Sequence, residues 1–572
     1  MAQQRLILVM VGALAGGSLY LLFRMVSEGG LNQTVAMAAM VFVGVLFTSL
    51  LALTGPMELP RALGRAGLQA GIVAALIFWA SLRFNAVDDV ATSPIIVASG
   101  LILTFIPLPF ILAEDGLGWR NYPALFMAAW GIVMRSTVAW VFVGILWLVI
   151  YLSHALLSLV GIDVISQIIL MPPVPWLITG TAFGLAMAVA LELSEVMSAY
   201  LVLRLLRLLV PVILVVMAVF LVAVGLNGFG RLQGVSASAI LLAMVGLAAT
   251  LVTSAVDQTD EDAVQTLAMQ RATQGLAAIL ILQAGVASWG IVVRVLDHGW
   301  TPERLFASTV AVLALGYGVT YLYAVARGRA WMERIRQANI WMAVALMALA
   351  VLWLTPVLNP ERISVNSQMA RFESGKTPLA EFDVYSLFQW GRAGAAAKVV
   401  LAEKAKSDPA LATVMASPEY AASPATVDAE AMRAALKTAL PVQPASGSGV
   451  RDQLLARASD YDLQSWTAAC AVTLEVGGPA CVLVVADFLP GRPGQEALLL
   501  LGSEGGYVTY LGYALDGGTL TSLSVDSGSG ALANDEDGLR LIAELQAAMP
   551  GLRPVPRNEL AMPASGAISL KP

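Results

Sequence analysis

The chain has 572 residues and a mean hydropathy of +0.77, and 58% of its residues are hydrophobic while 13% are charged. Soluble domains carry about 25% charged residues, so this composition excludes an ordinary soluble protein. The formal net charge of −6 and the lack of a basic stripe also exclude a nucleic-acid-binding surface.

Apolar stretches of about 20 residues follow one another up to Pro356, and this part contains no lysine. A helix of that length matches the roughly 30 Å hydrocarbon core of a bilayer. The sequence therefore predicts an α-helical polytopic membrane bundle over residues 1–356, with the lipid bilayer as its partner. The predicted spans number about eleven: 6–26, 35–54, 67–84, 95–113, 136–160, 176–193, 205–226, 236–256, 274–295, 304–325 and 338–356.

Residues 120–135 form a moderately apolar stretch that ends at Arg135. We interpret this stretch as an interfacial extension of the fifth span, because an arginine near the middle of a separate span would cost about 3 kcal/mol. A separate crossing would raise the count to twelve and change the orientation.

Arginine is distributed unequally between the two sides of the predicted bundle. With a cytoplasmic N-terminus, twelve arginines lie on the cytoplasmic side and five on the other. The twelve are Arg5, Arg61, Arg65, Arg120, Arg135, Arg204, Arg207, Arg271, Arg327, Arg329, Arg334 and Arg336, and the five are Arg24, Arg83, Arg231, Arg294 and Arg304. Because positive residues favour the cytoplasmic side, we expect a bacterial inner-membrane protein whose chain beyond Pro356 is periplasmic.

Three regions are predicted beyond the bundle. Residues 357–416 are helical and juxtamembrane, and residues 417–450 are a linker rich in Pro, Ser, Gly and Ala, although 429–440 has the composition of a short helix. Residues 451–572 are a β-rich unit, which makes the extracytoplasmic part an α+β domain. Its predicted strands are 466–476, 480–487, 497–501, 507–511 and 520–525, and a helix over 536–548 closes it.

Both cysteines of the chain, Cys470 and Cys481, fall in the exported region, where a disulfide persists. We expect them to be bonded, which would close a loop worth roughly 2–3 kcal/mol in the chain-entropy model. A tight turn at residues 477–478 would not place them directly opposite. Cα atoms more than about 7 Å apart would rule out the bond.

Glu192 and Glu195 lie one helical turn apart near the end of the sixth span and are the best candidates for an intramembrane ionisable pair. One interpretation is an ion or proton path. The other, which we favour, is a structural ion pair in which Arg204 and Arg207 neutralise the two carboxylates. His154 in the fifth span leaves the same alternatives open.

Two acidic segments also have a structural and a functional interpretation. Residues 259–262, Thr-Asp-Glu-Asp, fit a helix N-cap with acids in the first turn better than a cation site. The loop from Asp487 to Glu496 resembles calcium-binding loops of propeller-type repeats. Its two carboxylates are few for calcium, so we favour a plain strand–turn–strand.

Glycine pairs at helical spacing, Gly12 with Gly16 and Gly180 with Gly184, permit close helix crossing. Such spacing is common by chance in glycine-rich membrane helices, and we attach no specific contact to it.

The most distinctive block has the residues of a helix start: Thr301 as N-cap, Pro302 at the first position and Glu303 near the positive end of the dipole. The whole block is Gly299-Trp300-Thr301-Pro302-Glu303-Arg304. It resembles the same block in a bacterial integral-membrane family catalogued as domain of unknown function 4153. The resemblance covers most of the chain, is most specific between about 257 and 394, and continues at Asn339, Asn359, Pro360, Ser364, Ser367, Gln368, Arg371, Gly391, Arg392 and Gly394. It implies an integral membrane protein and no reaction.

No phosphate-binding loop, dinucleotide fingerprint or nucleophile elbow is found, so we name no catalytic, cofactor-binding or metal-binding residue. Scarce intramembrane acids, histidines and cysteines argue against a membrane-embedded enzyme. We expect a non-enzymatic envelope scaffold or sensor that presents a periplasmic domain to an envelope protein. The alternative is a secondary transporter or channel that uses Glu192 and Glu195, with His154 as a further candidate.

Overall fold

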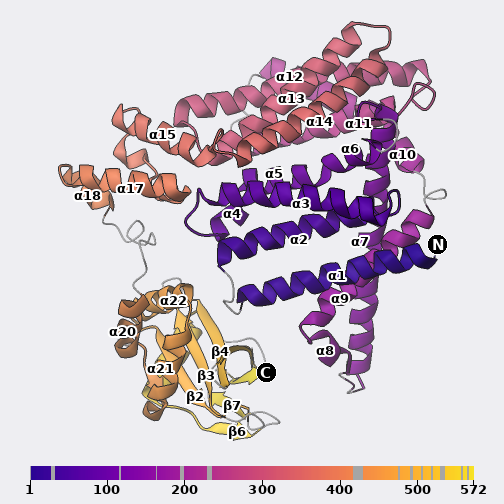
Figure 1. Cartoon of the computed structure of the whole chain (residues 1–572). Helices are drawn as coiled ribbons and strands as arrows, with labels where there is room; N and C mark the ends of the chain where they lie inside the picture. The colour runs from indigo at the N-terminus through magenta and orange to yellow at the C-terminus, as the bar shows by residue number, and fades with distance from the viewer. Residues whose placement is uncertain are drawn as a thin grey trace. The chain divides into compact units, whose positions relative to one another are not determined.

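The chain folds into two compact units, Met1–Ala422 and Ser423–Pro572, in the computed structural model (Figure 1). The first unit is helical, and the second combines helices with a sheet. The structure describes residues 2–27, 32–114, 118–160, 162, 164–193, 199–227, 235–415, 429–474, 477–489, 494–503, 507–516, 519–527, 535–554, 558–562 and 566–571.

Eleven helical segments of the described chain are long and apolar enough to cross a membrane, as the sequence predicts. Two short helices, α4 (Asp88–Thr92) and α8 (Val164–Ile169), lie between them. The eleven are α1 (Ala2–Ser27), α2 (Gln33–Leu53), α3 (Leu59–Ser81), α5 (Pro94–Phe105) with α6 (Pro107–Glu114), α7 (Tyr122–Ser158), α9 (Pro173–Glu192), α10 (Ala199–Asn227), α11 (Val235–Val256), α12 (Leu267–His298), α13 (Pro302–Ala326) and α14 (Trp331–Leu354).

The fifth span, α7, is one continuous helix from Tyr122 to Ser158, so residues 122–135 do not cross separately. Arg135 is buried on this helix and donates from Nε to the Gly131 carbonyl (3.0 Å) and from Nη2 to the Ala52 carbonyl (3.5 Å). Ala52 lies in the last turn of α2, where the helix dipole favours a cation. In Figure 1, α7 runs steeply across the neighbouring spans.

The fourth span is interrupted at Ile106, where the sequence predicts an unbroken helix over 95–113. Pro107 has no N–H to donate to the Leu103 carbonyl. The side chain of Gln69 on α3 takes that place, because its Nε2 donates to the carbonyls of Leu103 (2.9 Å) and Thr104 (2.8 Å). The break is therefore a satisfied part of the fold.

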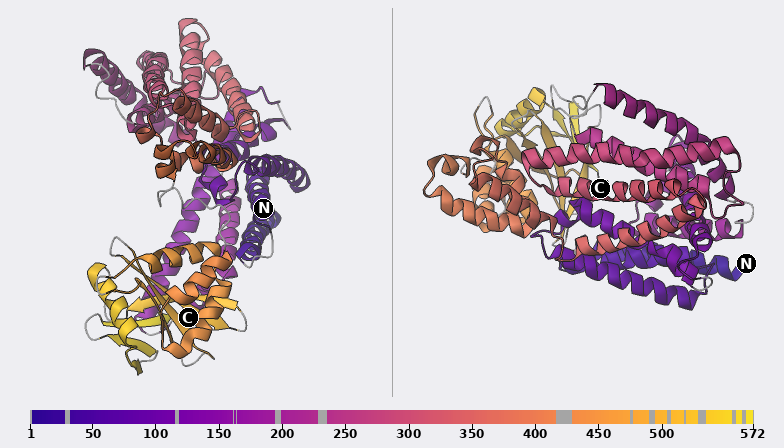
Figure 2. Two further views of the ribbon diagram at one scale, coloured as in Figure 1. Left: turned by 90° about the vertical axis from the view of Figure 1, so that its left-hand side faces the viewer. Right: turned by 90° about the horizontal axis from the view of Figure 1, so that it is seen from above.

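The two glycine pairs face each other where α1 crosses α9. Figure 2 shows the helices of this unit from two further sides. A Cβ built on Gly12 would lie 2.1 Å from the Gly180 carbonyl oxygen, and one on Gly184 would lie 2.2 Å from that of Leu8. Any side chain here would push the helices apart, so the spacing that sequence alone leaves unassigned serves this crossing.

Helices also fill the region beyond Pro356: in Figure 1, α15 lies at one end of α12–α14, and α17 lies near the end of α3. They are α15 (Pro360–Glu373), the 3₁₀ turn η1 (Leu379–Glu381), α16 (Val384–Phe388), α17 (Gly391–Ala405) and α18 (Pro409–Met415).

The second unit is a three-layer structure around one sheet with strand order β1-β2-β3-β4-β5-β8-β7-β6. Helices α20–α22 cover one face of β2 and β3, and α23 covers the other, so both strands are buried on both faces. The elements are α20 (Ala429–Ala439), β1 (Val442–Gln443), η2 (Ala445–Gly447), α21 (Ser448–Arg457), α22 (Asp460–Ala471), β2 (Cys481–Ala486), β3 (Glu496–Gly502), β4 (Val508–Asp516), β5 (Thr519–Ser527), α23 (Asp535–Ala547), β6 (Leu552–Pro554), β7 (Asn558–Met562) and β8 (Gly566–Lys571).

Two predictions for this unit are wrong. The linker predicted over 417–450 is folded from Ala429 onward: α20 matches the short helix that the composition of 429–440 indicates, and β1 joins the second unit. Residues 416–428 lie outside the described residues. The predicted strand over 466–476 is helix α22 up to Ala471, because Ser459 and Asp462 form a capping box at its start.

The structure joins Cys470 at the end of α22 to Cys481 at the start of β2 in a disulfide, with 5.0 Å between the Cα atoms. The bond links a covering helix to the sheet rather than two strands of a hairpin. The register problem of the hairpin does not arise.

Candidate functional site

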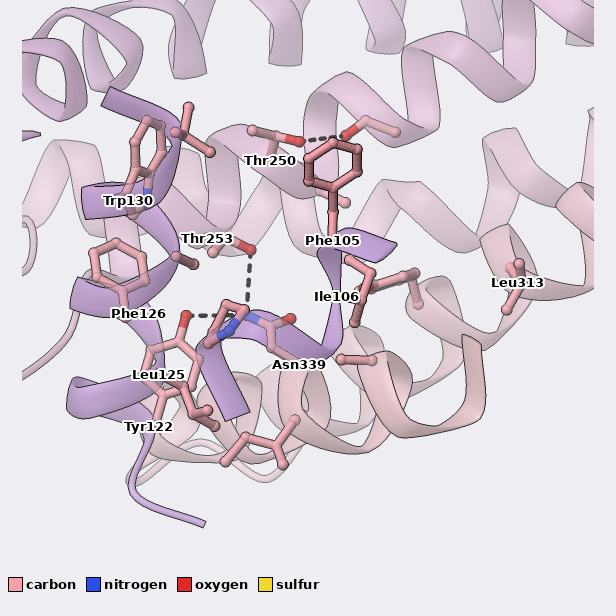
Figure 3. Close-up of a pocket in the computed structure, with 18 of the residues that line it drawn as sticks. Phe105, Ile106, Tyr122, Leu125, Phe126, Trp130, Thr250, Thr253, Leu313 and Asn339 are labelled. Atoms are coloured by element: carbon pink, nitrogen blue, oxygen red, sulfur yellow. Dashed lines mark hydrogen bonds between the residues drawn. The ribbon is translucent and has the colours of Figure 1, made fainter. Parts of the chain in front are cut away.

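A cavity of about 720 Å³ lies between five of the spans (Figure 3). Its walls come from the break between α5 and α6 and from α7, α11, α13 and α14. Phe105 and Ile106 stand at the break, and Phe126 and Trp130 on α7 continue the apolar wall. None of the described residues that line the cavity is charged.

One end of the cavity is polar and is organised around Asn339 of α14. Its Nδ2 donates to the Tyr122 hydroxyl (3.3 Å) and to Thr253 Oγ1 (3.2 Å), and its Oδ1 accepts from the Tyr321 hydroxyl (2.6 Å). The Thr253 and Tyr321 hydroxyls also contact each other at 3.0 Å. Four helices thus meet in one hydrogen-bonded cluster, in which both amide hydrogens of Asn339 are used.

Two tyrosine hydroxyls remain available at this end. The Tyr122 hydroxyl accepts from Asn339, but its own hydrogen has no acceptor among the described residues. Tyr317 lines the cavity one turn before Tyr321 on α13, and its hydroxyl has no hydrogen-bond partner in the described part of the chain. Because both groups donate, this end suits a ligand atom that accepts hydrogen bonds.

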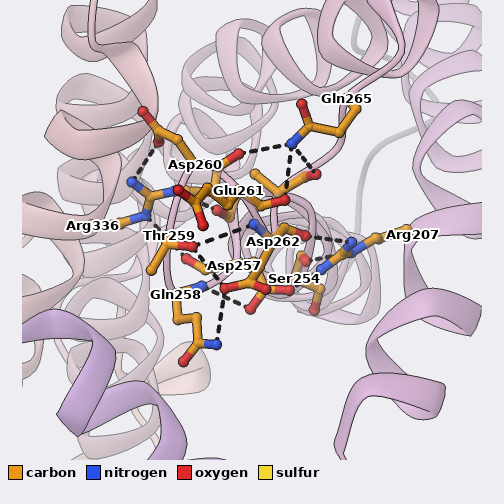
Figure 4. A network of polar contacts seen from close by, with 12 residues as sticks. Arg207, Ser254, Asp257, Gln258, Thr259, Asp260, Glu261, Asp262, Gln265 and Arg336 are labelled. Atoms are coloured by element: carbon orange, nitrogen blue, oxygen red, sulfur yellow. Dashed lines mark hydrogen bonds and ion pairs between the residues drawn. The ribbon is translucent and has the colours of Figure 1, made fainter.

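A charged network lies next to the polar end, around the α11–α12 loop (Figure 4). Arg207 of α10 forms an ion pair with Asp257 and donates to the carbonyls of Ser254 (3.0 Å) and Asp262 (2.9 Å). Burial raises the pKa of Asp257, whereas hydrogen bonds from Thr259 and Gln258 lower the pKa of Asp262. Both the arginine and its partner are buried, so the pair fixes the loop against α10.

Arg336 of α14 holds the same loop from the other side. It donates to Asp260 Oδ1 (2.7 Å) and to the carbonyls of Asp257 (3.1 Å) and Val256 (2.7 Å). The predicted N-cap at residues 259–262 is therefore wrong: Thr259 Oγ1 bonds within a turn, and α12 begins later, at Leu267. Asp260 instead pairs with Arg336 through its carboxylate, and Asp262 accepts from Arg207 through its backbone carbonyl.

Glu192 is paired, but its partner differs from the prediction. It forms an ion pair with Arg5 of α1, while Arg207 belongs to the loop network. Glu195 lies outside the described residues. This ion pair joins α1 and α9, the two helices of the glycine crossing.

His154 lies on α7 with its Nδ1 buried and without a hydrogen-bond partner in the described chain. A second cavity, of about 590 Å³, lies between α1, α2, α5, α7 and α9 and shares Phe105 and Ile132 with the first. Neither cavity is lined by His154 or Glu192.

The block that begins at Gly299 forms the predicted helix start. Thr301 Oγ1 accepts from the Arg304 backbone N–H (3.3 Å), and Pro302 and Glu303 occupy the first turn of α13. Gly299 has a φ of +75°, and a Cβ on it would lie 2.6 Å from Arg371 Cδ. The glycine thus admits helix α15 to this turn.

Helix α15 clamps the α12–α13 turn through three side chains. The Trp300 N–H donates to Ser367 Oγ (3.1 Å), and Gln368 Nε2 donates to the carbonyls of His298 and Trp300 (both 2.9 Å). Arg371 donates to the carbonyls of Leu296 (3.0 Å) and Asp297. These carbonyls end α12, and a cation there also complements the dipole. The residues by which the sequence resembles the family, in the α12–α13 turn and on α15, therefore meet in one contact.

A second attachment joins the juxtamembrane helices to the end of α3. The Arg392 N–H donates to the Arg83 carbonyl (2.8 Å), and a Cβ on Gly391 would lie 2.5 Å from that same oxygen. The Arg83 guanidinium lies 3.9 Å from the carboxylate of Glu361, and both are buried. Burial lowers the pKa of Arg83 and raises that of Glu361.

In the C-terminal unit, Glu496 is buried at the start of β3 and its Oε2 accepts the N–H groups of Phe488 (2.9 Å) and Leu489 (3.2 Å). Its carboxylate closes the turn after β2. No cluster of three or more His, Cys, Asp or Glu side chains suited to a metal occurs in the described residues.

Sequence reasoning missed Tyr122, Thr253 and Tyr321, although each is a polar side chain inside an apolar span. Asn339 entered only through the family resemblance. The sequence does contain a signal of this cluster, namely isolated polar residues in separate spans, because polar side chains inside a helical bundle form hydrogen bonds with one another.

The model of a family described as a domain of unknown function (DUF4153) matches residues 61–400. No curated protein and no solved structure matches the chain. The matched segment contains the lining of the first cavity, the loop network and the clamp, and it ends before the second unit.

Proposed function

The chain belongs to this DUF4153 family of unknown function, and we propose that it is a non-enzymatic bacterial inner-membrane protein that acts as an envelope scaffold or sensor. Its N-terminus is cytoplasmic and its second unit periplasmic in this proposal. The twelve-to-five arginine bias and an odd number of spans support that orientation. A disulfide in the second unit suits an oxidising compartment.

The observation that carries the proposal is the double attachment of the juxtamembrane helices. Arg371 and Gln368 hold α15 to the α12–α13 turn, and Arg392 holds the start of α17 to Arg83. A segment fixed at two points of a bundle keeps a defined position, whereas a free tether does not. The part of the chain beyond this segment is thus connected to a rigid base.

A secondary transporter is the second candidate, favoured by the interrupted fourth span beside a cavity. Discontinuous spans line substrate sites in many transporters. The path that the sequence suggests finds no support, because Glu192 is paired with Arg5 and lines neither cavity. Scaffolding or sensing therefore stays the leading proposal.

Complementation of a strain that lacks the gene tests this proposal. Loss of the protein should raise sensitivity to envelope stress such as dilute SDS, and the full chain should restore resistance. The clamp variant Gln368→Ala with Arg371→Ala should reach the membrane without restoring it. Reporters at Pro572 and in the 326–337 loop should report opposite sides.

The matched control is Arg5→Gln with Glu192→Gln, which removes an ion pair away from the clamp and should restore resistance. Full resistance with the clamp variant would contradict the scaffold. A gradient-driven flux in vesicles that Glu192→Gln abolishes would put the transporter first.

A further inference from the structure

We propose that the 720 Å³ cavity binds one neutral lipid, a long hydrocarbon chain that ends in an oxygen able to accept hydrogen bonds. This inference concerns the bundle alone and goes beyond the scaffold or sensor role. Either one can fail without the other.

The walls favour a hydrocarbon chain. The lining is apolar apart from its polar end, and the volume falls within the roughly 300–1,000 Å³ of ordinary ligand pockets. A cavity with apolar walls does not hold water, and an empty one deprives its lining of contacts. All of its walls belong to segments long and apolar enough to span a bilayer, where hydrocarbon chains are the abundant filler.

The polar end selects the head of the ligand. Asn339 uses its amide hydrogens on Tyr122 and Thr253 and its oxygen on Tyr321. What remains at the cavity are the hydroxyl hydrogens of Tyr122 and Tyr317, which have no acceptor among the described residues. A carbonyl or ether oxygen at the end of the chain would accept them.

The charges nearby exclude an anionic head. Arg207 and Arg336 are the arginines of the adjacent network, and each already meets a carboxylate and two backbone carbonyls. Bringing a carboxylate or phosphate to the polar end would bury a charge for which the described lining holds no cation. The ligand is therefore a neutral ester or a similar molecule.

Native mass spectrometry of the delipidated full chain tests the proposal with three probes: methyl oleate, oleate and octadecene. We expect one methyl oleate per chain and at least tenfold weaker retention of oleate. Tyr122→Phe with Tyr317→Phe should weaken methyl oleate binding roughly tenfold, as expected for lost hydrogen bonds, and leave octadecene unchanged.

Cavity-filling variants locate the site. Gly246 lines the cavity and a Cβ on it meets no atom within 4 Å, so Gly246→Leu should fold and abolish binding. Thr250→Leu fills the same wall one turn away, and it tests the site independently if Gly246→Leu does not fold. Gly144→Leu is the control, because that glycine is equally open but lies outside the cavity lining.

Undiminished methyl oleate binding in folded Gly246→Leu and Thr250→Leu would overturn the site. Equal retention of oleate and methyl oleate, or no effect of the tyrosine variant, would overturn the assignment of a neutral oxygen-bearing head.

Discussion

The two units of the chain bury their apolar side chains differently. In the described part of the second unit, Tyr507 is the only large hydrophobic residue that is mostly exposed. The first unit exposes such residues along nearly every span, including Leu208, Val212 and Val219 of α10. Water drives apolar burial in the second unit, whereas the helices of the first unit are long and apolar enough to cross a membrane, where lipid would offer them an environment as apolar as their own interior.

The two units should therefore lose stability through substitutions at different kinds of position. Close backbone contact and polar bonds must hold the spans together, as at the α1–α9 crossing and in the loop network. The second unit relies on a sheet buried on both faces and on one disulfide. Changes of a few atoms should therefore harm the first unit at polar and glycine positions and the second at its cross-link.

The largest effect is expected from Asp257→Asn. The change leaves the buried guanidinium of Arg207 without a carboxylate, and breaking a buried pair costs about 3–5 kcal/mol. SDS-induced unfolding of the purified chain measures the loss. Asp260→Asn is the control: this carboxylate is 71% exposed, and its loss should cost less than about 1 kcal/mol. Equal losses would mean that burial does not set the strength of these pairs.

Removing the cross-link should come next. Cys470→Ala with Cys481→Ala opens the loop and should lower the free energy of unfolding of the second unit by roughly 2–3 kcal/mol. Hydrogen exchange in the full chain resolves the units, and the amides of β2 and β3 should lose protection while those of α12 keep it. Equal loss of protection in α12 would show that the units are not independent in stability.

The glycine crossing should be sensitive to a single methyl group. Gly12→Ala places a Cβ 2.1 Å from the Gly180 carbonyl oxygen, so the helices must separate, at about 1–3 kcal/mol. Gly17→Ala is matched on the same helix, because its Cβ would meet Leu177 Cδ2 at an ordinary 3.6 Å. SDS-induced unfolding should distinguish the two, and equal stability would remove the crossing as a determinant.

The spans were predictable because a single physical quantity, hydropathy over the thickness of a bilayer, decides them. The interruption at Pro107 was missed, since a proline inside a span is tolerated when another side chain, here Gln69, takes the freed carbonyls. Helix α22 was mistaken for a strand because local composition outweighed its capping box. The packing of α22 on β3 is a tertiary contact, and the local sequence pattern does not reveal it.

The candidate site was far less predictable. Asn339 bonds to Tyr122 across 217 residues of sequence, and Glu192 meets Arg5 across 187. Nearness in sequence favoured Arg204 and Arg207 as partners of Glu192. The partner is Arg5 instead, because α9 packs on α1. Only the block at Gly299 was predicted in detail, because capping rules act within one turn.

The smallest effect concerns pH and the second unit. Burial raises the pKa of Glu496, so the folded unit holds this proton more tightly than the unfolded chain does. Stability should therefore fall as the pH rises above the ordinary pKa of 4.5, and the fall ends once the pH has passed the raised pKa of the folded unit. Glu496→Gln cannot ionise, and its side-chain oxygen can still accept the Phe488 and Leu489 N–H groups. We expect it to stabilise β2 and β3 at pH 7 and to have a smaller effect at pH 4, measured as hydrogen-exchange protection factors. Asp537→Asn, at a side chain 78% exposed, should change neither value. A native unit that gains stability from pH 4 to pH 7 relative to Glu496→Gln would show that the two backbone hydrogen bonds outweigh burial.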